Sequence, residues 1–310
     1  MSTRDAAGPG EDGVAAGFRC GHVAVVGRPN VGKSTLVNRL VGEKLSITSS
    51  RPQTTRHRIL GVRTTDAAQI LFVDTPGIHT GRARALNRYM NRAAVGALLG
   101  VDVAVMVVEA RVWKNEDDYV LGRVREHGTP VVLAINKVDS LKDKNLLLPF
   151  IAECAGRGQF AETIPISARR GTNVERLEAI VTSALPLGPA QFPPEQFTDR
   201  SERFMASEIV REKLIRRLEQ ELPHRLSVEI ETFRAEGETT RIGAVIWVES
   251  PGQKAIVVGR GGQLLKRAGT EARRDLEALL GSRVFLETWV KVRADWSDDE
   301  RVLARFGYED

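Results

Sequence analysis

The residues with the most specific chemistry form a short glycine-rich run near the N-terminus. Gly27–Ser34 reads GRPNVGKS, which fits the pattern G-x-x-x-x-G-K-[ST]. Glycines in such a loop let successive backbone N–H groups turn toward phosphate oxygens, while Lys33 reaches the terminal phosphates and the Ser34 hydroxyl ligates Mg²⁺. We therefore predict a nucleoside triphosphate site formed by Gly27, Arg28, Pro29, Asn30, Val31, Gly32, Lys33, Ser34 and Thr35.

The phosphate loop alone does not distinguish ATP from GTP. Recognition of the base depends on a second run, Asn136–Asp139. Guanine presents N1–H and N2–H₂ side by side, and one carboxylate accepts both hydrogen bonds, whereas adenine has no donors there. In isolation NKVD reads as a polar turn after a strand, but its order in the chain favours GTP/GDP. The predicted base contacts are Asn136, Lys137, Val138, Asp139, Ser167 and Ala168.

Two further segments concern the metal and the γ-phosphate. Asp74-Thr75-Pro76-Gly77 follows an apolar run, so Asp74 is expected to hold Mg²⁺ through water and the Gly77 N–H to sense the γ-phosphate. In Arg51–His57, two threonines are placed to close over Mg²⁺, and we favour Thr55 over Thr54. The predicted metal ligands are Ser34, Thr55 and Asp74, the predicted catalytic residues are Lys33, Thr55 and Gly77, and Thr75 and Pro76 complete the nucleotide site.

One position departs from the pattern of many GTPases. Ile78 follows Gly77, where those enzymes carry a glutamine that orients the attacking water. Either the water is positioned by other means or turnover is slow, and no general base is evident. Asn30 lies beside the phosphates and is a candidate to hold a monovalent cation, K⁺, that would add positive charge in the transition state.

A second glycine-rich loop occurs late in the chain. Gly259–Gly262 has the pattern G-x-x-G between two helical segments, and no Asp or Glu occurs from Lys254 to Arg267. A helix-capping turn is the commoner reason for such a loop, but the context and the local charge favour RNA binding by a KH-type domain. The predicted RNA contacts are Lys254, Gly259, Arg260, Gly261, Gly262, Lys266 and Arg267.

The phosphate loop and its companion motifs require strands that end at one edge of a sheet. Short runs of Val, Ile and Leu alternate with amphipathic segments, which is typical of a doubly wound, mostly parallel α/β sheet. The predicted strands are Val23–Val26, Ile70–Val73, Val103–Val108, Val131–Ile135 and Thr163–Ile166, with Arg58–Thr65 as an edge strand and a helix over Thr35–Val41.

The chain changes character after Leu185. Leu185–Phe197 contains four prolines and no periodicity, which indicates a linker. A small α+β module follows, with a helix that carries Val210, Leu214, Leu218 and Leu222 and ends at Pro223. Its expected strands are Ser227–Phe233, Arg241–Val248 and Arg283–Val292, and a short helix is expected over Asp298–Arg305.

Composition sets broad limits on the class of protein. The chain has 310 residues and a net charge of +5, which permits a polyanionic partner without requiring one. No run approaches the ~18 apolar residues that span a bilayer, and residues 1–20 are too polar for a signal peptide. Cys20 and Cys154 have no metal-like spacing and are interpreted as structural or inert thiols.

The chain as a whole resembles the bacterial Era family of GTPases. The resemblance rests on GRPNVGKST, QTTRHRI, DTPG and NKVD followed by the KH-type module, and on the longer runs Thr198–Ile209, Arg211–Lys213 and Trp289–Val292. It implies a GTPase that binds the 3′ end of small-subunit (16S) ribosomal RNA through a type II KH domain and assists 30S subunit maturation. We also expect the protein to be a monomer and to act in the cytoplasm. The family also implies peripheral association with the inner face of the cell membrane.

The resulting organisation is a disordered extension (1–20), a GTPase domain (21–185), a linker (186–200) and a KH domain with a terminal helix (201–310). An RNA-binding scaffold with a structural nucleotide and a membrane-surface regulator stay open as alternatives. Arg84, Arg88 and Arg92 recur every four residues, which predicts a solvated helix face, with a ribosome contact as the alternative. The five histidines form no cluster and are interpreted as surface or packing residues.

Overall fold

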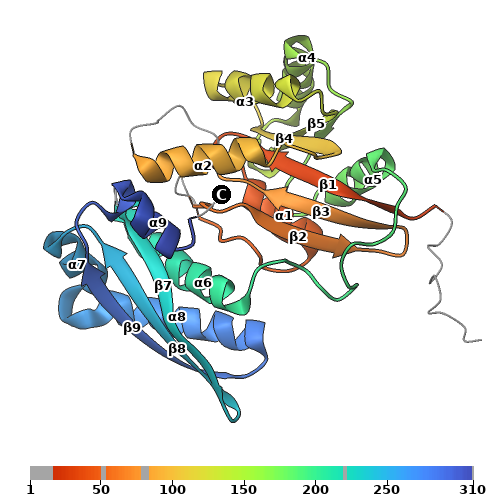
Figure 1. Ribbon diagram of the computed structural model, residues 1–310. Coiled ribbons are helices and arrows are strands. Elements are labelled where there is room, and N and C mark those ends of the chain that lie inside the picture. The colour runs from red at the N-terminus through yellow and green to blue at the C-terminus, as the bar shows by residue number, and fades with distance from the viewer. Residues whose placement is uncertain (1–16, 50–53, 78–83, 219–221, 309–310) are drawn as a thin grey trace, which may run out of the picture.

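The computed structural model describes residues 17–49, 54–77, 84–218 and 222–308 (Figure 1). Two separate sheets organise these residues, a six-stranded sheet in the first part of the chain and a three-stranded sheet in the last part. The predicted fold class, an α/β domain followed by a smaller α+β domain, is confirmed.

The large sheet has the strand order β2-β3-β1-β4-β5-β6, and only β2, at one edge, is antiparallel to its neighbour. All residues of β3 and β5 are buried, as expected for strands covered on both faces. The strands are β1 (Arg19–Val26), β2 (Ile59–Thr64), β3 (Ala68–Asp74), β4 (Val103–Glu109), β5 (Val131–Asn136) and β6 (Glu162–Pro165). Each predicted strand of this domain is therefore present, and β2 is the edge strand.

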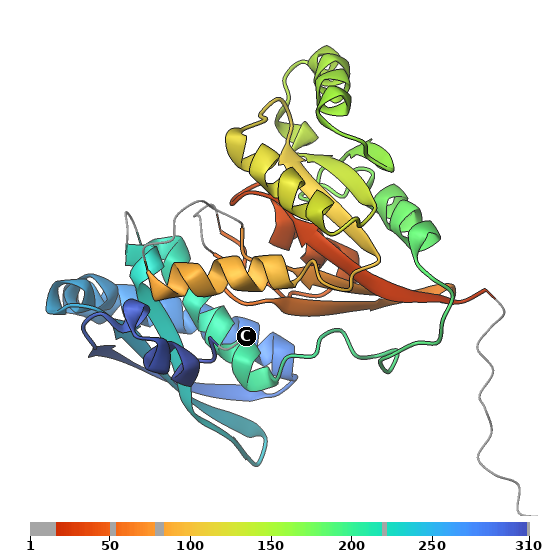
Figure 2. The same cartoon turned by 45° about the horizontal axis from the view of Figure 1, so that its top comes forward.

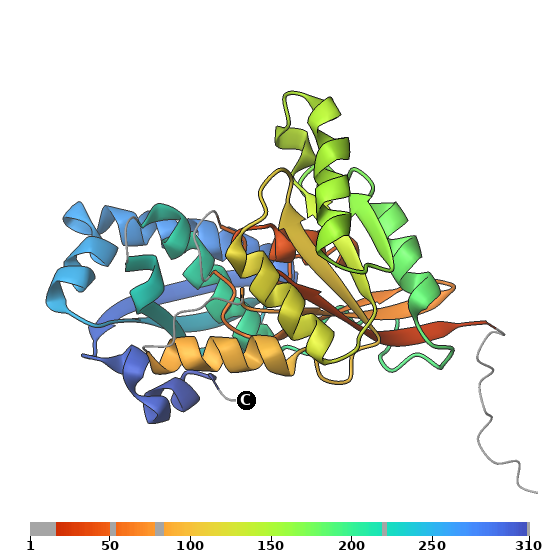
Figure 3. The same ribbon diagram turned by 90° about the horizontal axis from the view of Figure 1, so that it is seen from above.

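Helices cover both faces of this sheet (Figure 3). One face packs against α1 (Lys33–Val41) and α5 (Val174–Ala184), and the other against α2 (Ala85–Gly96), α3 (Asn115–Glu126) and α4 (Leu147–Arg157). The loops after β1, β3, β5 and β6 all leave the carboxyl ends of parallel strands, which places the predicted motifs at one edge.

The small sheet has the order β7-β8-β9, formed by β7 (Leu226–Glu236), β8 (Thr239–Val248) and β9 (Arg283–Val292). Strands β8 and β9 are parallel, and α6 (Glu202–Arg217) and α8 (Gln263–Leu280) share an apolar core with the sheet (Figure 2). Helix α7 (Pro251–Val258) precedes the glycine loop, and α9 (Glu300–Arg305) ends the described chain.

The helix predicted to end at Pro223 is shorter than expected. Helix α6 ends at Arg217, because Leu218 takes an extended backbone with φ −89° and ψ 150°. Leu218 and Leu222 are nevertheless buried in the core of the small domain. Their spacing reflects burial after the helix has ended, and not a continuing helix face.

The segment between α5 and α6 has no helix or strand of its own, but it follows the large sheet closely. Val62 donates to the Phe197 carbonyl at 2.9 Å, and the Thr198 hydroxyl donates to the Leu60 carbonyl at 2.8 Å. These bonds cover part of the edge of β2, which would otherwise expose unpaired backbone groups. At the other end, β1 begins at Arg19, two residues inside the expected extension; residues 1–16 lie outside the described residues.

The arginine-rich helix face is solvated in part, since Arg88 and Arg92 are exposed, but Arg84 and Arg88 also face acids of the small domain. Helix α2 lies beside α9 and shares an apolar cluster with it that contains Tyr89, Trp296 and Leu303 (Figure 1). Arg88 pairs with Glu300 at 3.2 Å, and Arg84 lies 3.7 Å from Glu249. The spacing predicted the shared face but not the second domain that it meets.

Within the residues that the structure describes, no helix combines the length and the apolar composition needed to cross a bilayer.

Candidate active site

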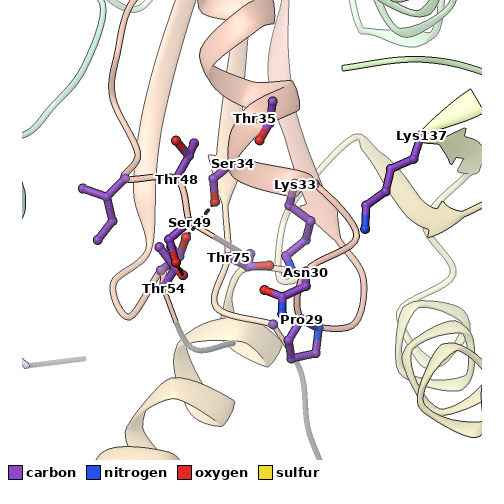
Figure 4. A pocket seen from close by; sticks show the side chains of 14 residues that line it. Pro29, Asn30, Lys33, Ser34, Thr35, Thr48, Ser49, Thr54, Thr75 and Lys137 are labelled. Atoms are coloured by element: carbon purple, nitrogen blue, oxygen red, sulfur yellow. Dashed lines mark hydrogen bonds between the residues drawn. The ribbon is translucent and has the colours of Figure 1, made fainter. Parts of the chain in front are cut away.

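A pocket of about 330 Å³ opens where the strands of the large sheet end (Figure 4). A pocket of this size falls within the range of small-ligand sites. Its lining comes from the phosphate loop, from residues 47–49 and 54–55, and from Thr75, Gly77 and Lys137. The structure thus brings together segments that lie more than a hundred residues apart. Ile78, which follows Gly77 in the sequence, lies outside the described residues.

The phosphate loop is closely fitted to the loop that carries the base-reading motif. Gly32 has φ +104°, and a Cβ there would lie 2.3 Å from the Asn136 amide nitrogen, so only glycine fits. The Asn136 side chain donates to the Val31 carbonyl at 2.7 Å and accepts from the Ala168 N–H at 2.9 Å. One buried amide therefore links the phosphate loop to the loops after β5 and β6.

Lys33 is buried at the first position of α1. Its ammonium donates to the carbonyls of Gly27 and Arg28 at 2.9 and 3.1 Å. Burial lowers the pKa of Lys33 to about 8, because few water molecules stabilise the charge, although Asp74 opposes the shift. An arriving phosphate would supply an anionic partner in direct contact with this ammonium.

The expected metal ligands lie on one side of the pocket. The Ser34 and Thr55 hydroxyls are 2.7 Å apart, which brings together the threonine favoured from the sequence and the phosphate loop. Asp74 is fully buried, and neither of its carboxylate oxygens has a hydrogen-bond partner among the described residues. Burial raises the pKa of Asp74, and the nearby Ser46 hydroxyl and Lys33 oppose the rise. Two hydroxyls and an open carboxylate form an oxygen donor set that suits Mg²⁺.

The base-reading residues lie at the other end of the site. Asp139 accepts a hydrogen bond of 2.6 Å from the Ser167 hydroxyl, which orients the carboxylate. Lys137 has a left-handed backbone with φ 66°, and its ammonium lies 3.1 Å from Glu109. Val138 packs against the apolar core, and Pro76 is buried, so their side chains support the loops.

One part of the site had no signal in the sequence. Arg28 is nearly buried and pairs with Asp117 of α3 at 3.1 Å and with Glu109 at 3.2 Å. Glu109 also holds Lys137, so these ion pairs connect the phosphate loop to the NKVD loop. Neither acid belongs to a motif, and both lie more than eighty positions from Arg28, which explains why the sequence analysis missed them.

The second glycine loop lies in the small domain, apart from this pocket. Gly259, Gly261 and Gly262 all have positive φ, and at Gly262, with φ +74°, no atom lies within 4 Å of the site of an added Cβ. Lys254, Arg260, Lys266 and Arg267 are exposed around this loop, and within the described part of the chain none of them forms an ion pair. The predicted RNA contacts therefore lie together on one accessible surface.

Comparison with known proteins agrees with both domains. A model of 50S ribosome-binding GTPases matches residues 22–137, and a model of the KH domain matches residues 221–297. The chain is therefore a P-loop GTPase joined to a KH domain. GTPase Era of Stenotrophomonas maltophilia R551-3 is 54% identical over 290 residues (94% of this chain, 97% of the relative), and GTPase Era of Coxiella burnetii Dugway 5J108-111 is 53% identical over 291 residues (94% and 98%). The chain belongs to the Era family of GTPases, as its motifs predicted.

Solved structures extend the likeness to the whole described fold. A crystal structure of a single-residue variant of Aquifex aeolicus Era bound to GDP·AlF4⁻ has a TM-score of 0.92 at 37% identity and covers 94% of this chain and 100% of its own. A crystal structure of Era in complex with MgGDPNP and nucleotides 1506–1542 of 16S ribosomal RNA gives the same values.

Proposed function

We propose that the pocket binds GTP with Mg²⁺ and hydrolyses the γ-phosphate through positioning and electrostatics. Lys33 would neutralise the terminal phosphates, the Gly77 N–H would contact the γ-phosphate, and Asp139 would select guanine. Lys33, Thr55 and Gly77 are the proposed catalytic residues. The observation that carries the proposal is Asp74, a buried carboxylate with both oxygens open beside Lys33 and the Ser34–Thr55 pair.

The metal would be held by Ser34 and Thr55 directly and by Asp74 through water. When bound, Mg²⁺ neutralises charge that develops on the β- and γ-phosphates. The test is Asp74→Asn, which keeps the size but removes the charge. We expect at least a roughly tenfold rise in the Mg²⁺ concentration needed for half-maximal hydrolysis, and an unchanged requirement would contradict the metal assignment.

Asn30 is proposed to hold K⁺ beside the phosphates. It lines the pocket with a positive φ of 64°, which turns the phosphate loop sharply at this residue. Hydrolysis should therefore be several-fold faster in potassium than in sodium buffer, and Asn30→Ala should remove that difference. Equal rates for the original chain in the two buffers would count against this role.

The KH loop is proposed to bind the 3′ region of 16S ribosomal RNA during 30S assembly. Support comes from the accessible cations without acidic partners around Gly259–Gly262 and from the relative solved with 16S nucleotides. This partner implies a cytoplasmic place of action, with membrane contact as a peripheral property.

The RNA role is tested with Gly262→Asp, which places a negative charge in the open space beside the loop. The matched control is Gly237→Asp in the β7–β8 turn, where φ is +62° and the surroundings are equally open. At fixed salt, we expect the first variant to bind a 16S 3′-end RNA roughly tenfold more weakly and the second to bind normally. Equal affinities would refute the role, and displacement of RNA by anionic liposomes would favour a membrane-surface regulator.

A further inference from the structure

Helix α6 is buried on two sides and lies between the two domains (Figures 1 and 2). Its apolar residues, among them Val210 and Leu214, belong to the core of the small domain. The charged residues Glu208, Arg211 and Glu212 are also buried, with at most 3% of their surface exposed. Buried charges of this kind need close partners, and several of theirs lie in the GTPase domain.

The first partner lies next to the predicted metal ligand Thr55. Arg211 donates to the backbone carbonyl of Thr54, and it also forms two hydrogen bonds to Glu208, at 2.6 and 2.7 Å. Burial acts to raise the pKa of Glu208, but the Arg211 guanidinium outweighs it, so that the pKa stays below its ordinary value and the pair is ionised. The arginine is thereby held in one orientation against the Thr54 backbone.

The second partner, Thr48, lies on the same side of the nucleotide pocket as Thr54 (Figure 4). Glu212 accepts from the Thr48 N–H at 2.9 Å and from Lys44 at 2.6 Å. Arg216, four residues further along α6, donates to the Thr48 carbonyl at 3.0 Å. Thr48 and Thr54 both line the pocket, and Ser49 bridges them through a 2.9 Å hydrogen bond to Thr54.

The residues after Thr54 contact both domains. Thr55 faces Ser34 in the phosphate loop, whereas Arg56 donates to the Leu226 carbonyl at 2.8 Å and His57 stacks on Tyr308 at 4.5 Å. The Thr55 hydroxyl thus belongs to a short segment whose neighbours are anchored in the small domain. A GTPase domain without the small domain would lose these two anchors.

We propose that α6 of the KH domain provides positioning residues for GTP hydrolysis: Arg211, oriented by Glu208, and Glu212 hold the backbone of Thr54 and Thr48 on one side of the pocket so that Thr55 stays beside Ser34. The inference rests on the proposed role of Thr55. Arg211 and Glu212 do not line the pocket, so they act through Thr54 and Thr48. Their loss should therefore affect hydrolysis and the use of Mg²⁺ more than binding of GDP.

The test replaces the buried pair as a unit in the full chain, Glu208→Leu with Arg211→Met. An apolar pair of similar size removes both charges of the pair together and is often tolerated, whereas removal of one partner is strongly destabilising. Arg217→Met is the matched control, because Arg217 lies on the same helix but pairs with Glu271 of α8. For each variant we would measure single-turnover hydrolysis, the Mg²⁺ concentration that gives half-maximal hydrolysis (the Mg²⁺ midpoint), GDP affinity and melting temperature.

We expect the double variant to hydrolyse GTP at least tenfold more slowly, equivalent to about 1.4 kcal/mol. The Mg²⁺ midpoint should rise, GDP affinity should stay within about threefold, and the control should match the original chain. A normal rate and Mg²⁺ midpoint in the folded double variant would overturn the inference, and so would an equal loss in the control, because both results would deny Arg211 a specific effect.

Two more variants keep the inference testable and separate it from the proposed function. If the double variant does not fold, Glu212→Met takes its place. Methionine is of similar length but offers Thr48 no acceptor, while Lys44 keeps its pair with Asp275. An unaltered rate there refutes the positioning role. Thr55→Val removes the hydroxyl itself. A normal hydrolysis rate in this variant would overturn the role of Thr55 and the inference with it. If Thr55→Val hydrolyses GTP slowly but the double variant has a normal rate, only the positioning by α6 is overturned.

Discussion

The base preference offers the sharpest single substitution, Asp139→Asn. The carboxylate of Asp139 is mostly buried, with 15% of the side chain exposed, and Ser167 uses one of its acceptor sites at 2.6 Å. A carboxylate has about four such sites, so enough remain for guanine N1–H and N2–H₂. In asparagine, Ser167 can keep its bond to the oxygen, which leaves an NH₂ group facing two guanine donors.

The size of the effect follows from the two bonds that are lost. Hydrogen bonds to a charged group contribute about 1.5–3 kcal/mol each, so the two together amount to about 3–6 kcal/mol. This corresponds to roughly a 10²–10⁴-fold loss of GDP affinity. Xanthine carries an oxygen in place of the N2 amino group, and this oxygen would accept from the new NH₂, so affinity for XDP should rise.

The assay is a fluorescence competition titration with GDP and XDP at fixed Mg²⁺. Asp143→Asn serves as control, since Asp143 is a nearby acid whose side chain caps the short turn Lys144–Leu146. GDP affinity within about threefold of the original chain would refute the assignment. A loss of GDP binding with no gain for XDP would also contradict direct reading of the base by Asp139.

Three further predictions concern buried groups. Burial lowers the pKa of His57 to about 3 in the folded chain, whereas the histidine of the unfolded chain has a pKa of about 6.5. The unfolded chain therefore takes up the proton first, and the free energy of unfolding falls as the pH drops below 6.5, by about 2 kcal/mol at pH 5. His57→Phe should abolish this difference between urea unfolding at pH 7 and at pH 5. Phosphate binds the ammonium form of Lys33, whose pKa is about 8. GDP affinity should therefore be constant below pH 8 and weaken above it, by up to about tenfold per pH unit. Lys33→Arg stays charged and should show no such decline. Leu303→Ala in the cluster between α2 and α9 should lower the free energy of unfolding by about 2–5 kcal/mol, and a change below about 1 kcal/mol would show that this cluster is loosely packed.

Local spacing made the large sheet and the nucleotide motifs predictable. Gly27–Ser34 and Asn136–Asp139 each carry their chemistry within a short run of residues, and strands buried on both faces leave apolar runs that need no knowledge of the partner strand. The parallel arrangement then places the motifs at one edge, which is why residues as distant as Ser34 and Ser167 were assigned to one site.

Contacts between distant residues left no such signal. Periodicity showed that Arg84 and Arg88 share a helix face, but not that acids of the small domain face them. The four-residue spacing of Leu218 and Leu222 looked like a helix, although both are buried after α6 has ended. Likewise Arg28 and Asp117 meet only because α3 packs beside the phosphate loop, which the sequence does not express.

The stacking of His57 on Tyr308 also has a consequence for synthesis of the chain. Arg56 and the Tyr308 hydroxyl, 3.2 Å apart in the structure, are separated by 252 positions in the sequence. A ribosome that has translated as far as the start of α6 has produced every strand of the large sheet, but not the small-domain anchors that hold Arg56 and His57. In a growing chain, the segment next to Thr55 therefore lacks these two anchors until Leu226 and Tyr308 have been translated.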